Sequence, residues 1–170
     1  MRVGPVAGGV LLEHVKYLSL QLDLRPEDRF CWYTTTSWMM WNFQVGGLLV
    51  GSTIVLYDGS PTHPGTDGMW RVLAEHGVTV FGAGAGYLLA CAKEDLHPGI
   101  PDRGGYALDA VRAVGSTGSP LPASGFRWVQ EGLGRGLHRM TGRPAHVGDP
   151  GGQVVELLME CVAHPLSLCA

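Results

Sequence analysis

The stretch WYTTTSWMMWNFQVGGLLVGSTIVLYDGS, residues Trp32–Ser60, decides the fold that the sequence predicts. It starts with the end of a strand and a threonine-rich turn, Thr34–Ser37, and continues into an apolar helix over Trp38–Val50. Because this helix is apolar on nearly every face, we expect it in the interior. The β-branched run Thr53–Tyr57 is typical of a strand covered on both faces. The stretch therefore predicts the middle of an α/β layer, with the turn beyond the carboxyl end of a strand, where such sheets bind ligands.

Strands and helices alternate on both sides of this stretch. Upstream, apolar residues at helical spacing predict a helix over Gly8–Leu22, and Phe30–Tyr33 reads as the first strand. Downstream we expect a helix from Met69 to Ala74 with Asp67 as its N-cap and Gly77 as its stop, a strand Val78–Phe81, a helix Tyr87–Lys93, a strand Val111–Val114 and a helix Phe126–Glu131. Four alternations predict the α/β class, a parallel sheet with helices on both faces.

The composition changes after Gly134, where glycine, proline and arginine accumulate without helical or strand periodicity. We therefore expect a partial domain over residues 1–133. Residues 134–170 are expected to be an irregular tail, either disordered or out of frame with the sequence before it. Within the tail, Val154–Met159 suits one helical turn or a short strand.

Length, charge and cysteine usage limit the function. At 170 residues the chain is one domain or part of one. A net charge of −3 argues against nucleic acid or acidic lipid as partner. The cysteines form no CxxC pair, which favours a reducing compartment without disulfides or zinc. The apolar run Val45–Tyr57 is shorter than the roughly 20 residues that span a bilayer. We expect a cytoplasmic protein that binds neither nucleic acid nor membrane.

Two glycine-rich segments are candidate ligand loops. Gly82–Gly86 contains G-x-G without the full dinucleotide spacing, so a plain strand-to-helix turn is the better interpretation. In Gly115–Pro120 the small residues would let a ligand approach the backbone closely, and a plain turn is equally compatible. Trp38, Met39 and Met40 suit a core, a pocket wall or both. The histidines show no metal-ligand spacing, and no Ser-His-Asp arrangement is visible.

Longer motifs resemble a known family. The stretches WYTTTSWMMWNFQVGGLLVGSTIVLYDGSP (Trp32–Pro61) and VRAVGSTGSPLPASGFRWVQEGLG (Val111–Gly134) are similar to acetoacetyl-CoA synthetases, which belong to the adenylate-forming superfamily. The resemblance covers about Gly8 to Gly134. Acetyl-CoA synthetases share the layout, but they usually carry Gly-Glu-Pro where this chain has Gly-Ser-Pro, so Ser119 favours the acetoacetyl branch.

The resemblance implies a two-step reaction: a carboxylate attacks the α-phosphate of Mg-ATP to give an acyl-adenylate, and the thiol of coenzyme A then displaces AMP. It implies no catalytic and no metal-binding residue within this chain. It assigns the nucleotide site to Gly118, Ser119 and Pro120, the acyl pocket to Trp38, Met39 and Met40, and the approach of coenzyme A to the loop Gly82–Ala85, with Gly82 and Ala83 as contacts.

The family's phosphate loop, the acidic motif that helps to hold Mg²⁺ and the C-terminal lysine have no counterpart in this sequence. We therefore expect an internal fragment of the N-terminal domain that is inactive alone and pairs with the missing parts of the same enzyme. ATP or AMP, Mg²⁺, coenzyme A and a short carboxylic acid are its implied ligands. The alternatives are a non-catalytic nucleotide-binding remnant or interaction module, or a fragment of the acetyl-CoA synthetase type. Strands left at an open sheet edge would invite aggregation.

Overall fold

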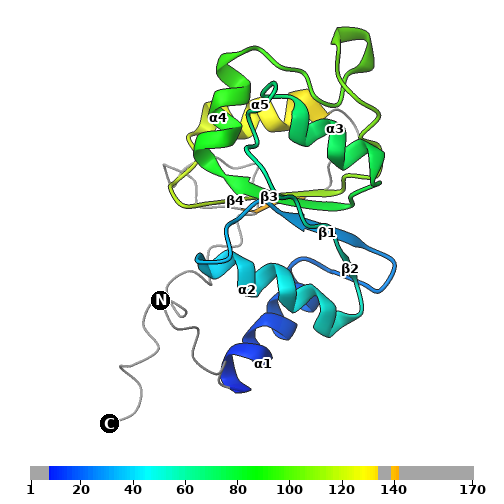
Figure 1. The fold of residues 1–170 in the computed structure, drawn as a ribbon, viewed down its shortest axis with the longest axis vertical. Helices are drawn as coiled ribbons and strands as arrows, with labels where there is room; N and C mark the ends of the chain where they lie inside the picture. The colour runs from blue at the N-terminus through cyan, green and yellow to red at the C-terminus, as the bar shows by residue number, and fades with distance from the viewer. Residues whose placement is uncertain (1–7, 134–138, 142–170) are drawn as a thin grey trace.

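The computed structural model describes residues 8–133 and 139–141, which form an α/β arrangement around one sheet (Figure 1). The described strands lie in the order β2-β1-β3-β4-β5, and every neighbouring pair is parallel. This confirms the predicted parallel sheet. The strands are β1 (Arg29–Trp32), β2 (Thr53–Ile54), β3 (Val80–Gly84), β4 (Ala113–Thr117) and β5 (Arg139–Thr141).

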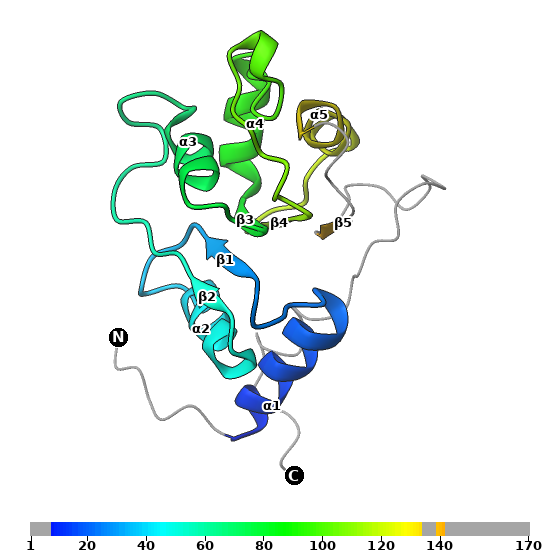
Figure 2. The same cartoon turned by 90° about the vertical axis from the view of Figure 1, so that its right-hand side faces the viewer.

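Helices cover both faces of the sheet, as predicted (Figures 1 and 2). One face carries α1 (Gly8–Lys16), the π-helical turn η1 (Tyr17–Gln21), α2 (Met39–Gly46) and the 3₁₀ turn η2 (Gly47–Val50). The other face carries α3 (Gly68–Glu75), α4 (Ala85–Lys93) and α5 (Ala123–Leu133), and the 3₁₀ turn η3 (Pro101–Arg103) follows α4. No helix in the described part of the chain is long and apolar enough to cross a membrane.

Each face of the sheet has its own aromatic core. Successive side chains of β1 point to opposite faces, so Phe30 and Trp32 belong to the cluster under α2, and Cys31 belongs to the cluster under α3–α5. The ring of Phe43 stands edge-on to Phe30 and Trp32, at centroid distances of 5.7 and 5.3 Å. On the other face, Trp70 is fully buried. Two aromatic clusters therefore fix the sheet between its helix layers.

The position of β2 corrects one expectation. Thr53–Tyr57 was expected to be a strand covered on both faces, but β2 contains only Thr53 and Ile54, Thr53 and Leu56 are exposed, and the strand is outermost in the described sheet. The helix over Trp38–Val50 is also less buried than predicted, because Leu48 and Leu49 are 55% and 48% exposed. Among the described residues no element packs beyond β2. The hydrophobic pattern predicted a strand at this place but could not reveal its short length or its outermost position in the described sheet.

Strands β3 and β4 extend past their predicted ends, because two glycine-containing segments read as loops are strand. Gly82, expected in a loop, pairs with Trp32 across the sheet. A Cβ at this position would stand 2.1 Å from Cδ2 of Trp32, so only glycine allows the indole to lie against the strand. A glycine inside a strand marks such a close approach. The predicted loop Gly82–Ala85 is therefore wrong as a local structure.

A buried ion pair fixes the amino ends of three strands. Asp28 precedes β1, and its carboxylate accepts hydrogen bonds from Nη2 of Arg112 at 2.6 Å, from Nε of Arg112 at 3.1 Å and from Oγ1 of Thr79 at 2.7 Å. Burial by itself raises the pKa of Asp28, but the hydrogen bonds and the charge of Arg112 outweigh it, and the pKa lies below its ordinary value. Thr79 and Arg112 directly precede β3 and β4, so this network aligns the sheet.

Two further predictions concern the ends of α3. Asp67 occupies the N-cap position but makes no capping hydrogen bond, and its carboxylate instead accepts one from the hydroxyl of Tyr106. Gly77 follows the helix with a φ of 55°, and its N–H bonds the carbonyl of Ala74, which confirms it as the stop. Strand β5 lies within the segment where no regular element was expected, while Val154–Met159 falls outside the described residues.

Candidate functional site

The predicted site residues gather at the carboxyl edge of the sheet. Gly84 and Thr117 are paired, so β3 and β4 end at the same level, and the N–H of Tyr33 donates to the carbonyl of Gly82 at 2.7 Å just after β1 ends. The loops that follow β1 and β4 therefore flank the end of β3, which lies between them in the sheet. Segments more than 70 residues apart in sequence thus share one edge, where parallel sheets bind ligands.

The loop after β4 is exposed at this edge. Gly118, Ser119 and Pro120 are all exposed, while Leu121 directly after them is fully buried. Gly118 has a φ of 88°, a conformation that favours glycine, although a Cβ there would meet nothing within 4 Å. The backbone, not crowding, therefore requires this glycine. The anchored loop offers free backbone groups and a hydroxyl to a ligand.

The loop after β1 is a hydroxyl-rich turn. The N–H of Trp38 donates to the carbonyl of Thr35 at 3.1 Å, and the hydroxyls of Thr35 and Ser37 lie 3.1 Å apart. The three residues predicted for the acyl pocket differ in burial: Trp38 is 56% exposed, Met39 is half-buried and Met40 is buried in the core cluster beneath α2. Trp38 therefore faces out at the edge, while Met40 packs inward.

Gly82 and Ala83, predicted as contacts of coenzyme A, are both buried in β3. Trp32 covers Gly82 on one face, and Ala83 belongs to the core on the other. The exposed positions nearby are Gly86 and, in part, Gly84, at the start of α4. Any ligand at this point would meet the helix start rather than the two residues named from the sequence, whose binding role stays a prediction.

Ser116 in β4 is a residue that sequence reasoning missed. It is only 5% exposed, and its hydroxyl has no hydrogen-bond partner among the described residues. It pairs with Ala83 across the sheet, one position before the carboxyl end. A buried hydroxyl without a partner costs about 1–3 kcal/mol. Ser116 was not singled out because Gly115–Pro120 was read as a loop, whereas residues 115–117 belong to β4.

Two tyrosines hold the loop after β2 against this edge. The hydroxyl of Tyr33 donates to the carbonyl of Gly59, and that of Tyr57 donates to the carbonyl of Ser60, both at 3.1 Å. Their ring centroids are 6.1 Å apart. Partial burial and the neighbouring Tyr57 raise the pKa of Tyr33, so its hydroxyl remains a donor. The edge thus has an ordered wall on the β2 side.

The groups exposed at the edge are suited to binding a ligand. Burial raises the pKa of the Cys31 thiol to about 12, which makes it inert. Within the described residues, no group of three or more His, Cys, Asp or Glu side chains could hold a metal ion. Backbone groups, hydroxyls and apolar side chains remain, which suit a base or a short acyl group.

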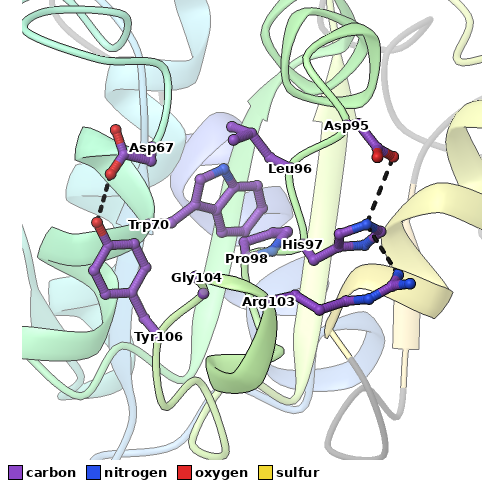
Figure 3. Close-up of a pocket in the computed structure, with 10 residues that line it drawn as sticks. Asp67, Trp70, Asp95, Leu96, His97, Pro98, Arg103, Gly104 and Tyr106 are labelled. Carbon is purple, nitrogen blue, oxygen red and sulfur yellow. Dashed lines mark hydrogen bonds and ion pairs between the residues drawn. The ribbon is translucent and has the colours of Figure 1, made fainter.

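A separate small cavity lies on the outer side of α3, between that helix and the loop after α4 (Figure 3). Its volume is about 60 Å³, and none of the predicted site residues lines it. One wall holds the pair Asp67–Tyr106, and on the other Nη1 of Arg103 lies 3.0 Å from Nε2 of His97. The volume of this cavity is far below the roughly 300–1,000 Å³ of typical ligand pockets, so the cavity is too small to hold a nucleotide.

Comparison with known proteins now identifies the class of protein. Residues 8–142 match the family described as AMP-binding enzyme, and the chain belongs to this family. The resemblance predicted from the sequence is confirmed by its relatives. The chain is 40% identical over 136 residues to malonamoyl-CoA synthetase of Penicillium aethiopicum, which covers 74% of this chain and 19% of that protein. It is 40% identical over 127 residues to acetoacetyl-coenzyme A synthetase of Rhizobium meliloti, with coverage of 75% and 19%.

A solved structure agrees with both the sequence and the fold. Acetoacetyl-CoA synthetase from Streptomyces lividans superposes with a TM-score of 0.68 at 54% identity, over 74% of this chain and 19% of that one. The predicted fold, a part of the large domain of adenylate-forming enzymes, is thereby confirmed. The chain spans about a fifth of the length of the relatives it matches.

Proposed function

We propose that the chain is part of an acetoacetyl-CoA synthetase, an enzyme that joins a short carboxylic acid to coenzyme A at the expense of ATP. The 54% identity to the Streptomyces lividans enzyme supports this assignment. The chain would supply the adenine side of the nucleotide site and a border of the acyl pocket. Because it spans about a fifth of its relatives, we expect no acyl-CoA synthesis from the chain alone.

Gly118, Ser119 and Pro120 would hold the adenine. Their backbone groups and the Ser119 hydroxyl are exposed at the end of β4, and a base edge presents hydrogen-bond donors and acceptors that such groups can pair with. The main contribution of this edge to catalysis by the whole enzyme would be to place the nucleotide next to the carboxylate of the acid substrate. Bringing two reactants together in this way removes much of the entropic part of the barrier.

Trp38, Met39 and Met40 would border the acyl chain, with Trp38 as the exposed member. The names of the relatives narrow the class of acid. Acetoacetate and malonamate are both short carboxylic acids whose C3 is a carbonyl carbon, and they differ in the group bound to C3, a methyl in one and an amino group of similar size in the other. We therefore propose a short acid with a carbonyl at C3 as substrate. Coenzyme A would approach past the start of α4, above Gly82 and Ala83.

The ATP, Mg²⁺ and coenzyme A of the whole enzyme would need further protein groups, which the missing parts of the same enzyme would provide. No group of three or more metal-ligating side chains lies among the described residues, so the side chains that hold Mg²⁺ would come from those missing parts. We also propose a cytoplasmic location, which the free thiols of Cys31 and Cys91 support, since unpaired cysteines suit a reducing compartment.

The exposed loop after β4 is the observation that carries this proposal, and calorimetry with AMP and with Mg-ATP tests it. We expect AMP to bind the wild-type chain and binding to be lost in Ser119→Tyr, whose ring would fill the loop's exposed face. Glu27→Tyr is the matched control, because Glu27 is also exposed but lies just before β1, at the amino ends of the strands. Equal AMP binding by both variants would refute the assignment.

A binding module without catalysis is the second candidate, and the coverage of about a fifth of the relatives favours it. AMP binding without pyrophosphate release from acetoacetate, ATP and coenzyme A is expected from either an inactive part or a free-standing module. Addition of the remaining parts of the Streptomyces lividans enzyme separates the two, since only a part of the enzyme would restore acyl-CoA formation. An acetyl-CoA synthetase-type fragment would instead favour acetate in the restored assay.

A further inference from the structure

We propose that Thr117, the last residue of β4, determines which acid the site accepts, by donating a hydrogen bond from its hydroxyl to the carbonyl oxygen at C3 of the substrate. The acyl group then lies in the space beside Gly84, the residue of β3 that pairs with Thr117 across the sheet. This inference rests on the proposed function and names the residue that recognises the C3 carbonyl.

Thr117 and Gly84 face the side of the sheet that carries α2 (Figure 2). In β4, Ala113 packs in the core cluster on the α2 side, and because successive side chains of a strand point to opposite faces, Thr117 lies on that side too. In β3, Ala83 belongs to the cluster on the α3–α5 side, which places Gly84 on the α2 side. Helix α2 begins beyond the carboxyl end of β1, and its N-cap residue Trp38 is exposed. The two residues are therefore on the same face as the proposed border of the acyl pocket.

The glycine at residue 84 is not required by the fold. Its φ of −66° and ψ of 144° are extended values that any residue adopts. A Cβ there would approach only the carbonyl oxygen of Thr117, at 3.9 Å, which is ordinary van der Waals contact. Gly82, two residues earlier on the same face, is different, because the indole of Trp32 fills its space. The indole thus closes the inner end of the face, while Gly84 leaves room for a ligand to approach the backbone closely.

The hydroxyl of Thr117 supplies the donor at this place. Thr117 is half-buried, and within the described part of the chain its hydroxyl makes no hydrogen bond. A threonine hydroxyl has one proton to donate, and the acids proposed above share a carbonyl oxygen at C3 that accepts one. The same donor serves both acids whichever group, methyl or amino, is also bound to C3. A site built to hydrogen-bond a substrate group discriminates against the analogue that lacks this group.

Titration of the full chain with acetoacetate and with butyrate, followed by the backbone amide signals in nuclear magnetic resonance spectra, tests the proposal. Butyrate is the matched probe, because it differs from acetoacetate only in having a methylene group at C3. We expect acetoacetate to shift the amide signals of Gly84 and Thr117 and to bind about three- to tenfold more tightly than butyrate, the factor that one hydrogen bond contributes. Thr117→Val should weaken acetoacetate binding by about the same factor and leave butyrate binding unchanged. A merely structural role of Thr117 would weaken both.

Two control variants match the substitutions. Thr53→Val makes the same change at an exposed position of β2 that pairs with Arg29 at the amino end of β1, and it should bind both acids as the wild type does. Gly84→Ala should weaken both acids by about tenfold, because the methyl group takes the space of the acyl group. Gly9→Ala adds a methyl group at an exposed position of α1 and should change neither. A thermal melt checks that each variant is folded.

The outcomes separate this proposal from the proposed function. Equal affinity of the wild type for the two acids would overturn the proposal, as would equal weakening of both by Thr117→Val or unchanged binding in Gly84→Ala. Absence of acid binding would overturn it as well, and calorimetry with AMP on the same sample then shows how far the failure extends. If AMP binds, the proposed function stands and only the role of Thr117 is refuted. If AMP does not bind either, both are refuted.

Discussion

The indole of Trp32 lies against the backbone of Gly82, in a space that any side chain at residue 82 would need. We predict that Gly82→Ala destabilises the chain by about 1–3 kcal/mol, because the added methyl would overlap the ring and force β1 or β3 to shift. Chemical denaturation measures this free energy. Gly86→Ala is the control: Gly86 is exposed in α4, a Cβ there meets nothing within 4 Å, and alanine should stabilise the helix by about 0.5–1 kcal/mol. Equal effects of the two substitutions would contradict the packing argument.

Removal of the unpaired hydroxyl of Ser116 should stabilise the chain. Ser116→Ala is expected to raise the free energy of unfolding by about 1 kcal/mol, since a methyl group carries no unmet hydrogen bond into the core. Ser124→Ala, at an exposed position of α5, should change it by less than about 0.5 kcal/mol. Destabilisation by Ser116→Ala would show that the hydroxyl has a partner in solution.

Arg112 is expected to contribute far more to the stability of the fold than Arg25, an ion-paired arginine at the surface. Arg112→Met would leave the buried carboxylate of Asp28 without its cation and should cost about 3–5 kcal/mol of unfolding free energy. Arg25 pairs with Asp23 at the surface, where both side chains are more than half exposed, and Arg25→Met should cost less than about 1 kcal/mol. Urea denaturation of both variants checks the difference, and similar losses would count against a buried network.

Acid should weaken the fold through the same carboxylate. Because the folded-state pKa of Asp28 is lowered, its contribution to stability is complete above the unfolded pKa of about 3.9 and is lost as the pH falls through the folded value. The loss of stability below about pH 4 should therefore be steeper in the wild type than in Arg112→Met, where the pair is absent. Parallel acid titrations would refute this.

His14 should add a second pH dependence at milder acidity. Burial between α1 and α2 lowers its pKa, and its ring stands edge-on to Phe43 at 5.9 Å. Below about pH 6.5 the unfolded chain binds a proton at this residue that the folded chain resists, so stability should decrease with falling pH until the folded pKa is reached. His14→Gln should flatten the profile in this window. An unchanged slope would exclude His14 as its source.

The sequence predicted the layer structure because that depends on local pattern. Apolar residues at helical spacing predicted α1, and the β-branched run predicted a strand at the place of β2. The misplaced features depend on contacts between distant segments. Asp67 was predicted to cap α3, but its carboxylate instead accepts a hydrogen bond from the hydroxyl of Tyr106, 39 residues later in the sequence. Gly82 looked like a loop, since nothing local reveals that Trp32 covers it.

The candidate site shows the same limit. Gly118–Pro120 was found because glycine and proline mark a turn wherever they stand, and the structure exposes this turn. Met40 was named with its neighbours, but the turn of the helix directs it into the core. Ser116 escaped notice because its importance arises only from burial without a partner. Exposure and pairing are properties of the assembled sheet, and no single segment contains them.

The network of Asp28, Thr79 and Arg112 also has a consequence for the order of assembly. Its bonds join residues 51 and 84 positions apart, so none of them can form within one local segment. Structures that depend on such distant contacts fold slowly, since long loops must close first. During synthesis the bonds from Arg112 to Asp28 can form only after residue 112 has left the ribosome. Until then the carboxylate of Asp28 lacks its cation, so β4 is the last of these three strands to be fixed by the network.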